Sequence, residues 1–150
     1  MLDLKSSGIE QDVHEALCVG GWKQRDYVIT STEPQALENV CLKDPLVHTG
    51  LVVDDPKVLD VVLGLASSST LTPALAQTFR PFFSLRADFL SVDEQLLTSK
   101  ELSEATKQRI PLVPWTVNSR EKLMHLLRHE AVIGVITDDV QKAVEVKAQL

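Results

Sequence analysis

Hydrophobic residues in this chain fall in short β-rich runs that alternate with segments of helical periodicity. The β-rich runs predict six strands, over 2–5, 27–30, 48–53, part of 82–90, 112–116 and 132–136. The helical pattern predicts helices over 11–19, 31–40, 57–66, 98–108, 120–128 and 138–147, with one short helical turn at 73–78. Strands that alternate with helices are typical of βα units in a parallel sheet. The fold class we expect is therefore α/β with parallel βα units.

Several of the predicted helices carry start or stop signals. Gly20 and Gly21 end the first helix, since glycine is favoured just past a helix C-terminus. Pro34 stands in the first turn of the second helix, where its missing N–H costs nothing. Either Asn118 or Ser119 is expected to cap the helix over 120–128. We find no repeat and no linker that would split the chain.

Polar side chains stand at the carboxyl ends of most of the predicted strands. They are Asp3 and Lys5, Ser31 and Thr32, Asp54 and Asp55, Thr116 and Asn118, and Thr137 and Asp138. Ligands of parallel α/β folds bind at this edge, because the strand ends and the following loops converge there. Polar residues at these positions also cap the next helix, which is the simpler interpretation for Asp55, Asn118, Ser119 and Asp138. Both interpretations stay open at this point.

Composition limits the classes of partner. The chain has 150 residues, 44% of them hydrophobic, which suits one core, so we expect a single domain over 1–150. The net charge is −6 and no cluster of Lys or Arg interrupts it, which disfavours nucleic acid and an anionic membrane surface as partners. The longest nearly apolar run, 58–66, contains Asp60 and is too short to span a membrane.

The cysteines and the N-terminus indicate a cytoplasmic location. Cys18 and Cys41 make no C-x-x-C pair and both fall on predicted helices, so we expect free thiols in a reducing compartment. The first residues, MLDLKSS, carry charges where a signal peptide would have its apolar region.

Trp115 lies near the end of the fifth predicted strand, where it either packs between strand and helix or forms a pocket wall. It lies in VPWTVNSREKLMHLLRHEAVIGVITDD, residues 113–139. This stretch resembles the last two βα units of the glycerophosphodiester phosphodiesterase family, where a strand ending W-T-V-N is followed by a helix and a strand ending I-I-T-D. Upstream, residues 2–5 resemble the family's strand ending E-I-K, residues 27–37 its strand ending S-F, and residues 87–109 the segment before the Trp strand.

The resemblance implies a fold, an activity and a site. The family folds as a (β/α)₈ barrel, and this chain resembles its strands three to eight, so we expect an incomplete TIM-barrel-like fold and a partial domain. The implied substrate is a glycerophosphodiester, hydrolysed to glycerol 3-phosphate and an alcohol. Lys5, Trp115 and Asn118 are implied as substrate-binding residues. Asp3 is implied as a ligand of a divalent metal, calcium or magnesium.

Departures from the family pattern concern the catalytic groups. The family's first two strands carry its histidine and two of its metal carboxylates, with a further histidine following, and nothing in this chain matches them. The four histidines here, His14, His48, His125 and His129, lie away from the predicted ligand edge. We therefore expect no catalytic residue in this chain, and a metal only if the missing ligands are supplied.

Six strands would leave the strands over 2–5 and 132–136 as open apolar edges, which proteins normally cover. The chain is then a truncated piece, half of a two-chain barrel, or a self-associating remnant, and we expect a homodimer or a complementing barrel fragment. A non-catalytic remnant or a phosphate-binding module is the alternative function. A flavodoxin-like domain is a third possibility, but the chain has no Gly-rich loop after a strand.

Overall fold

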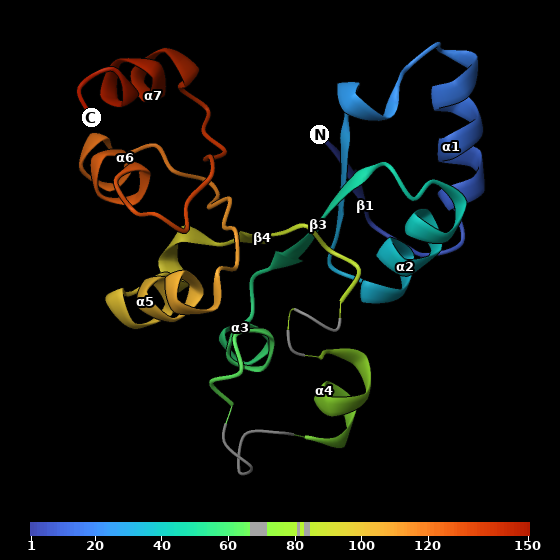
Figure 1. Cartoon of the computed structure of the whole chain (residues 1–150), viewed down its shortest axis with the longest axis horizontal. Coiled ribbons are helices and arrows are strands. Elements are labelled where there is room, and N and C mark those ends of the chain that lie inside the picture. Colours follow the sequence, from blue (N-terminus) through green and yellow to red (C-terminus); the bar gives the residue numbers. More distant parts are fainter. Residues whose placement is uncertain (67–71, 81, 83–84) are drawn as a thin grey trace.

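A curved parallel sheet lies at the centre of the chain in a computed structural model that describes residues 1–66, 72–80, 82 and 85–150. Strands β1 (Leu2–Leu4), β2 (Val28–Ser31), β3 (His48–Val53) and β4 (Phe89–Val92) neighbour one another in that order, and every pair is parallel. Helices follow the strands in an arc from α1 and α2, past α4 and α3, to α5, α6 and α7 (Figure 1).

The helices lie close to their predicted positions. Their bounds are α1 Glu10–Val19, α2 Pro34–Lys43, α3 Pro56–Val62, α4 Pro73–Thr78, α5 Ser99–Gln108, α6 Arg120–Leu127 and α7 Val140–Lys147. Short 3₁₀ turns cover η1 Gln24–Asp26 and η3 Glu94–Leu96. As predicted, Asp55 caps α3, and Ser119 caps α6. The cap of α7 is Asp139, which corrects the assignment to Asp138.

The fourth strand overlaps only the end of the predicted range over 82–90 and continues to Val92; residues 83–84 of that range are outside the described part. It starts at Phe89, after Asp88 has bonded β3 twice: the Asp88 N–H donates to Thr49 O at 2.7 Å, and the Asp88 carboxylate accepts from Thr49 N at 2.8 Å. Phe82 is buried and belongs to the core without being in a strand. Hydrophobic content alone placed the strand too early.

The sheet continues past β4 through the segments 111–115 and 132–136. Leu112 forms parallel bridges to Leu90 on one side and to Val132 on the other. Leu112 N donates to Ala131 O at 2.8 Å, whereas Pro114, two residues later on the same side, has no N–H to donate. The fifth and sixth predicted strands are therefore bridged segments rather than regular strands.

The core lies between the sheet and its helices. Register aligns Leu51 with Leu90, and a bridge adds Leu112, all three with no solvent exposure. These side chains belong to one large hydrophobic cluster that also contains Val58, Leu59 and Val62 of α3 and the buried residues of α5 and α6. A second, smaller cluster under α2 contains Leu4, Ile29, Val40 and Val47.

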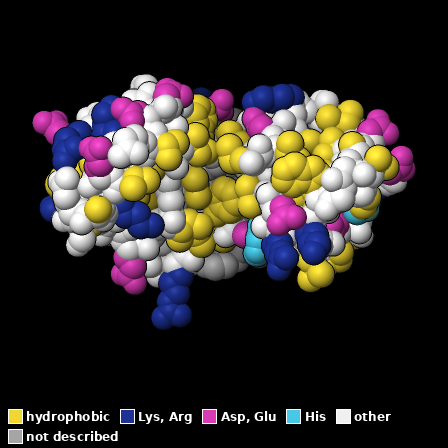
Figure 2. Space-filling model, turned by 90° about the horizontal axis from the view of Figure 1, so that it is seen from above, with side chains coloured by type: hydrophobic (Ala, Val, Ile, Leu, Met, Phe, Trp, Pro, Cys, Tyr) yellow, Lys and Arg dark blue, Asp and Glu magenta, His cyan; other side chains and the backbone are white. Residues whose placement is uncertain are grey.

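Successive side chains of a strand point to opposite faces of the sheet, so the residues between these core positions point to the other, concave side. Register aligns Asp3 with Thr30, Thr30 with Gly50, and Gly50 with Phe89 across four strands. Figure 2 shows a face on which hydrophobic side chains gather along a central hollow between two more polar flanks.

The sheet does not close on itself. Within the described residues β1 has a strand neighbour only in β2, and the segment 132–136 is bridged only to the segment 111–115. The predicted incomplete arrangement of parallel βα units is confirmed. Both cysteines are free, as expected. Across the described part of the chain, no helix combines the length and apolar character needed to cross a bilayer.

Candidate functional site

A cleft of about 240 Å³ opens where the parallel strands end. Residues from all four strands and from both bridged segments line it: Met1, Asp3, Lys5, Thr30, Val52, Ser91, Trp115, Thr116 and Ile136. Three of the four residues implied as functional, Asp3, Lys5 and Trp115, therefore lie together at this cleft. Asn118 is not among its lining residues.

The Asp3 carboxylate has a partner for each oxygen. Thr30, which has no solvent exposure, donates from its hydroxyl to Asp3 Oδ1 at 3.2 Å. Asp3 Oδ2 forms an ion pair with the Lys5 ammonium. The side chain of Lys5 is 80% exposed and that of Asp3 29%, so the ammonium remains accessible to an anion from solvent.

The backbone on both sides of Lys5 is anchored to the β2–α2 connection. The Ser31 hydroxyl donates to Leu4 O at 2.8 Å in a buried position. Ser7 N donates to the Glu33 carboxylate at 3.1 Å. Lys5 therefore has a fixed backbone, although its side chain is exposed.

Trp115 forms one wall of the cleft. Its indole Nε1–H donates to Ser91 O at 3.0 Å, and its backbone N–H donates to Val92 O at 2.9 Å. These bonds hold the polar edge of the ring against β4 and leave the half-buried remainder of the ring as cleft lining. Of the two interpretations of this Trp, the structure supports the pocket wall.

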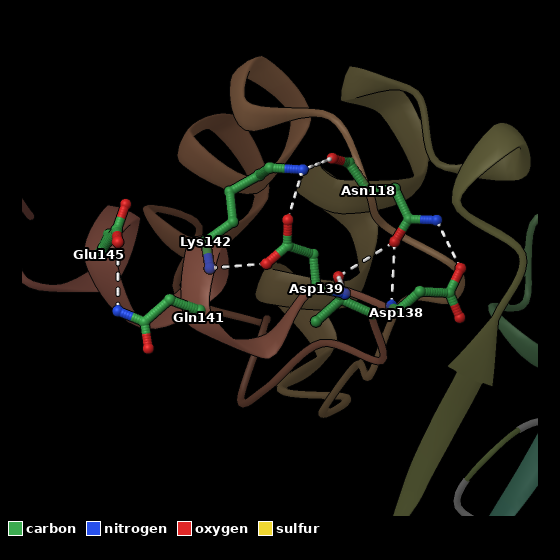
Figure 3. A network of polar contacts seen from close by, with 7 residues as sticks. Asn118, Asp138, Asp139, Gln141, Lys142 and Glu145 are labelled. Atoms are coloured by element: carbon green, nitrogen blue, oxygen red, sulfur yellow. Dashed lines mark hydrogen bonds and ion pairs between the residues drawn. The ribbon is translucent and has the colours of Figure 1, made fainter.

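Asn118 joins the ends of the last two bridged segments (Figure 3). Its Oδ1 accepts from Asp138 N at 3.0 Å and from the Thr137 hydroxyl at 3.1 Å, while its Nδ2 donates to Asp138 Oδ2 at 2.7 Å. Lys142 Nζ donates to Asn118 O at 3.2 Å. The backbone N–H and side chain of Lys142 hold the pKa of Asp139 below its usual range. Through these bonds the Asn of W-T-V-N contacts the Thr and the first Asp of I-T-D-D, a contact that the sequence pattern did not predict.

We predict that Asn118→Ala lowers the free energy of unfolding by about 1–2 kcal/mol, because three side-chain hydrogen bonds between the two loops are lost. Urea denaturation followed by circular dichroism measures it. Gln141→Ala is the control, since Gln141 is exposed and its side chain donates to Glu145 within the same helix. Equal stability of the two variants would show that the Asn118 contacts contribute nothing.

The residues present do not by themselves fit a divalent metal. Among the described residues, no group of three or more His, Cys, Asp and Glu side chains is placed to hold one. Asp3 is the single carboxylate among the described residues that line the cleft, whereas calcium takes six to eight oxygen ligands and magnesium six. None of the four histidines, all within the described ranges, lines the cleft.

A larger surface hollow of about 580 Å³ lies between α2 and α4. Its Arg80 is paired with Glu38. It contains neither Asp3, Lys5 nor Trp115, so the cleft at the strand ends is the candidate site.

Comparison with known proteins gives the family of the chain and solved structures with a similar fold. The sequence model of the glycerophosphoryl diester phosphodiesterase family matches residues 3–142. A search of curated proteins gave no match. A structure from Silicibacter pomeroyi DSS-3, assigned as a glycerophosphoryl diester phosphodiesterase, is similar with a TM-score of 0.69 at 14% identity, covering 99% of this chain and 50% of that one.

Two further solved structures are similar. One is an Oleispira antarctica phosphodiesterase in complex with the product sn-glycerol-3-phosphate, with a TM-score of 0.62 at 17% identity, covering 96% of this chain and 54% of that one. The other is a Thermotoga maritima glycerophosphodiester phosphodiesterase, with a TM-score of 0.59 at 17% identity, covering 97% of this chain and 57% of that one. This chain spans about half the length of these structures.

Proposed function

Because this chain belongs to the glycerophosphoryl diester phosphodiesterase family, we propose that its cleft takes a glycerophosphodiester and forms one part of a hydrolytic site. The products would be glycerol 3-phosphate and an alcohol. The observation that carries the proposal is that Asp3, Lys5 and Trp115, far apart in sequence, line one cleft at the carboxyl ends of parallel strands. The product complex of the Oleispira antarctica relative supports the substrate class.

The cleft supplies binding groups more clearly than catalytic ones. Lys5 presents an exposed ammonium for the phosphate, and Trp115 presents a wall for the organic part. Hydrolysis also needs a proton for the leaving alkoxide and further neutralisation of the phosphate. We propose that residues outside 1–150 supply these groups. A calcium or magnesium ion, as the resemblance implies, would have Asp3 as its ligand from this chain and would take its other ligands from those residues.

Residues 1–150 would then form one partial domain, completed by two further βα units. A complementing polypeptide segment at β1 and at the segment 132–136 is the first candidate, and a second copy of this chain is the other. We place the protein in the cytoplasm on the basis of its two free thiols. The alternative function is a non-catalytic remnant or phosphate-binding module, which the accessible Lys5 ammonium would also suit.

We predict that the purified chain releases no measurable glycerol 3-phosphate from glycerophosphocholine, with calcium or magnesium present. The reason is that the described cleft lining includes neither a histidine nor a second carboxylate. Addition of a polypeptide that supplies the first two βα units of a family barrel is expected to restore release. Phosphorus NMR measures the product, and sedimentation shows whether the mixture forms a heterodimer or the chain alone forms a homodimer.

Each outcome decides between the proposals. Metal-dependent release by the chain alone would contradict the requirement for a complement. A stable mixture that binds glycerol 3-phosphate but hydrolyses nothing would favour the non-catalytic alternative.

A further inference from the structure

Lys5 and Asp3 have the charged side chains of the cleft. Among the described residues that line it, Lys5 has the only cationic side chain and Asp3 the only carboxylate side chain. The carboxylate is engaged twice, by the Thr30 hydroxyl and by the Lys5 ammonium. The ammonium extends beyond this pair into solvent, with 80% of the side chain exposed. In this arrangement the accessible charge of the cleft is positive.

A dication at Asp3 would meet two obstacles. The Lys5 ammonium contacts the same carboxylate, so the cation would either displace it or stand beside a like charge at close range. A second obstacle is the donor set, because no other described residue that lines the cleft carries a carboxylate, thiol or imidazole, and the described part of the chain has no group of three or more such side chains placed to hold an ion. The cleft of this chain therefore suits an anion better than a cation.

We propose that this chain on its own, with no complement to supply further ligands, binds a phosphate ester in the cleft through Lys5 without a metal, and that Asp3 is then the partner of the Lys5 ammonium rather than a metal ligand. Thr30 is a positioning residue in this arrangement, because its buried hydroxyl fixes the carboxylate that faces Lys5. Trp115 and Ile136 supply the apolar wall for the organic part of the ester. The inference rests on the proposed function for the choice of a phosphate ester, and is independent of hydrolysis.

Binding is measured with glycerol 3-phosphate as the probe. The chain has two tryptophans, and Trp22 is 57% exposed, so Trp22→Phe leaves Trp115 as the single tryptophan, excited selectively at about 295 nm, without disturbing the core. Saturable change of Trp115 emission is expected in EDTA, with a Kd within about twofold of that in calcium chloride. Lys5→Gln is expected to raise the Kd at least about tenfold, because the attraction between the Lys5 ammonium and the phosphate dianion is lost. Lys107→Gln is the control, because Lys107 is an exposed lysine of α5 and is expected to leave the Kd unchanged.

Asp3→Asn separates the two roles of this residue. If Asp3 is a metal ligand, the substitution removes that ligand and calcium-dependent binding falls. If Asp3 is the partner of the Lys5 ammonium, binding in EDTA is expected to tighten about three- to tenfold, because the repulsion between the Asp3 carboxylate and the phosphate dianion disappears. Circular dichroism of each variant checks that it is folded.

The remaining outcomes overturn the inference. Binding that requires calcium and is lost in EDTA or in Asp3→Asn makes Asp3 a metal ligand and leaves the proposed function standing. Binding that survives Lys5→Gln removes Lys5 from the site. If Trp115 emission does not change with glycerol 3-phosphate in either EDTA or calcium chloride, the inference is overturned. Hydrolysis by the complemented protein in the same preparation would still support the proposed function. If neither binding nor hydrolysis is observed, both the inference and the proposed function are overturned.

Discussion

Leu112→Ala is expected to lower the free energy of unfolding by about 3–4 kcal/mol, among the largest effects of any single substitution in this chain. Leu112 has no solvent exposure and lies in the large core cluster. It is also the residue through which the segment 111–115 bridges both β4 and the segment 132–136. Truncation leaves a cavity where two parts of the sheet join.

Urea denaturation of the purified chain measures this loss. Leu42→Ala is the matched control, since Leu42 lies on α2 with 71% of its surface exposed and is expected to change stability by less than about 0.5 kcal/mol. A loss at Leu112 no larger than at Leu42 would show that the segment 111–115 is not part of the cooperative core.

Gly50→Ala is expected to lower the free energy of unfolding by about 2 kcal/mol, through overpacking. A Cβ at Gly50 would lie 2.3 Å from Cε2 and 2.4 Å from Cζ of the Phe89 ring. Phe89 is only 7% exposed, so the ring cannot leave without exposing its apolar surface. Glycine here provides the space that allows Phe89 to lie across β3 on the concave side.

A double-mutant cycle tests the cause of this loss. Phe89→Leu should reduce the cost of Gly50→Ala, because the smaller side chain removes the contact. Gly134→Ala is the control, since a Cβ there has no atom within 4 Å among its neighbours. Additive losses at Gly50 and Phe89 would contradict the steric explanation.

The helices and most of the sheet could be predicted from the sequence because their signals are local. Periodicity and the caps Asp55 and Ser119 depend on residues a few positions apart, and these assignments are confirmed. The fourth strand was placed too early, since Phe82 enters the core outside any strand and β4 begins only at Phe89. The sequence shows Pro114, but not that its missing N–H would have faced the segment 132–136 and so interrupts the pairing of the two segments. That depends on which segment lies beside it in the sheet.

The candidate site was predicted in part. Because Asp3, Lys5 and Trp115 stand at the carboxyl ends of predicted parallel strands, they were expected at one edge of the sheet, and all three line the cleft. Their roles in binding remain predictions. Asn118 occupies the same edge but joins the two loops instead of lining the cleft, because its partners Thr137 and Asp138 lie one βα unit away.

By itself the sequence determined the alternation of strands and helices, the family, and the edge at which Asp3, Lys5 and Trp115 gather, because each is encoded in local pattern or in a recognisable motif. Tertiary structure alone decided what each side chain meets. The pairing of Asp3 with Thr30 and the packing of Phe89 on Gly50 depend on the register between strands distant in the chain. Register is set by the whole core, so no short stretch of sequence contains it.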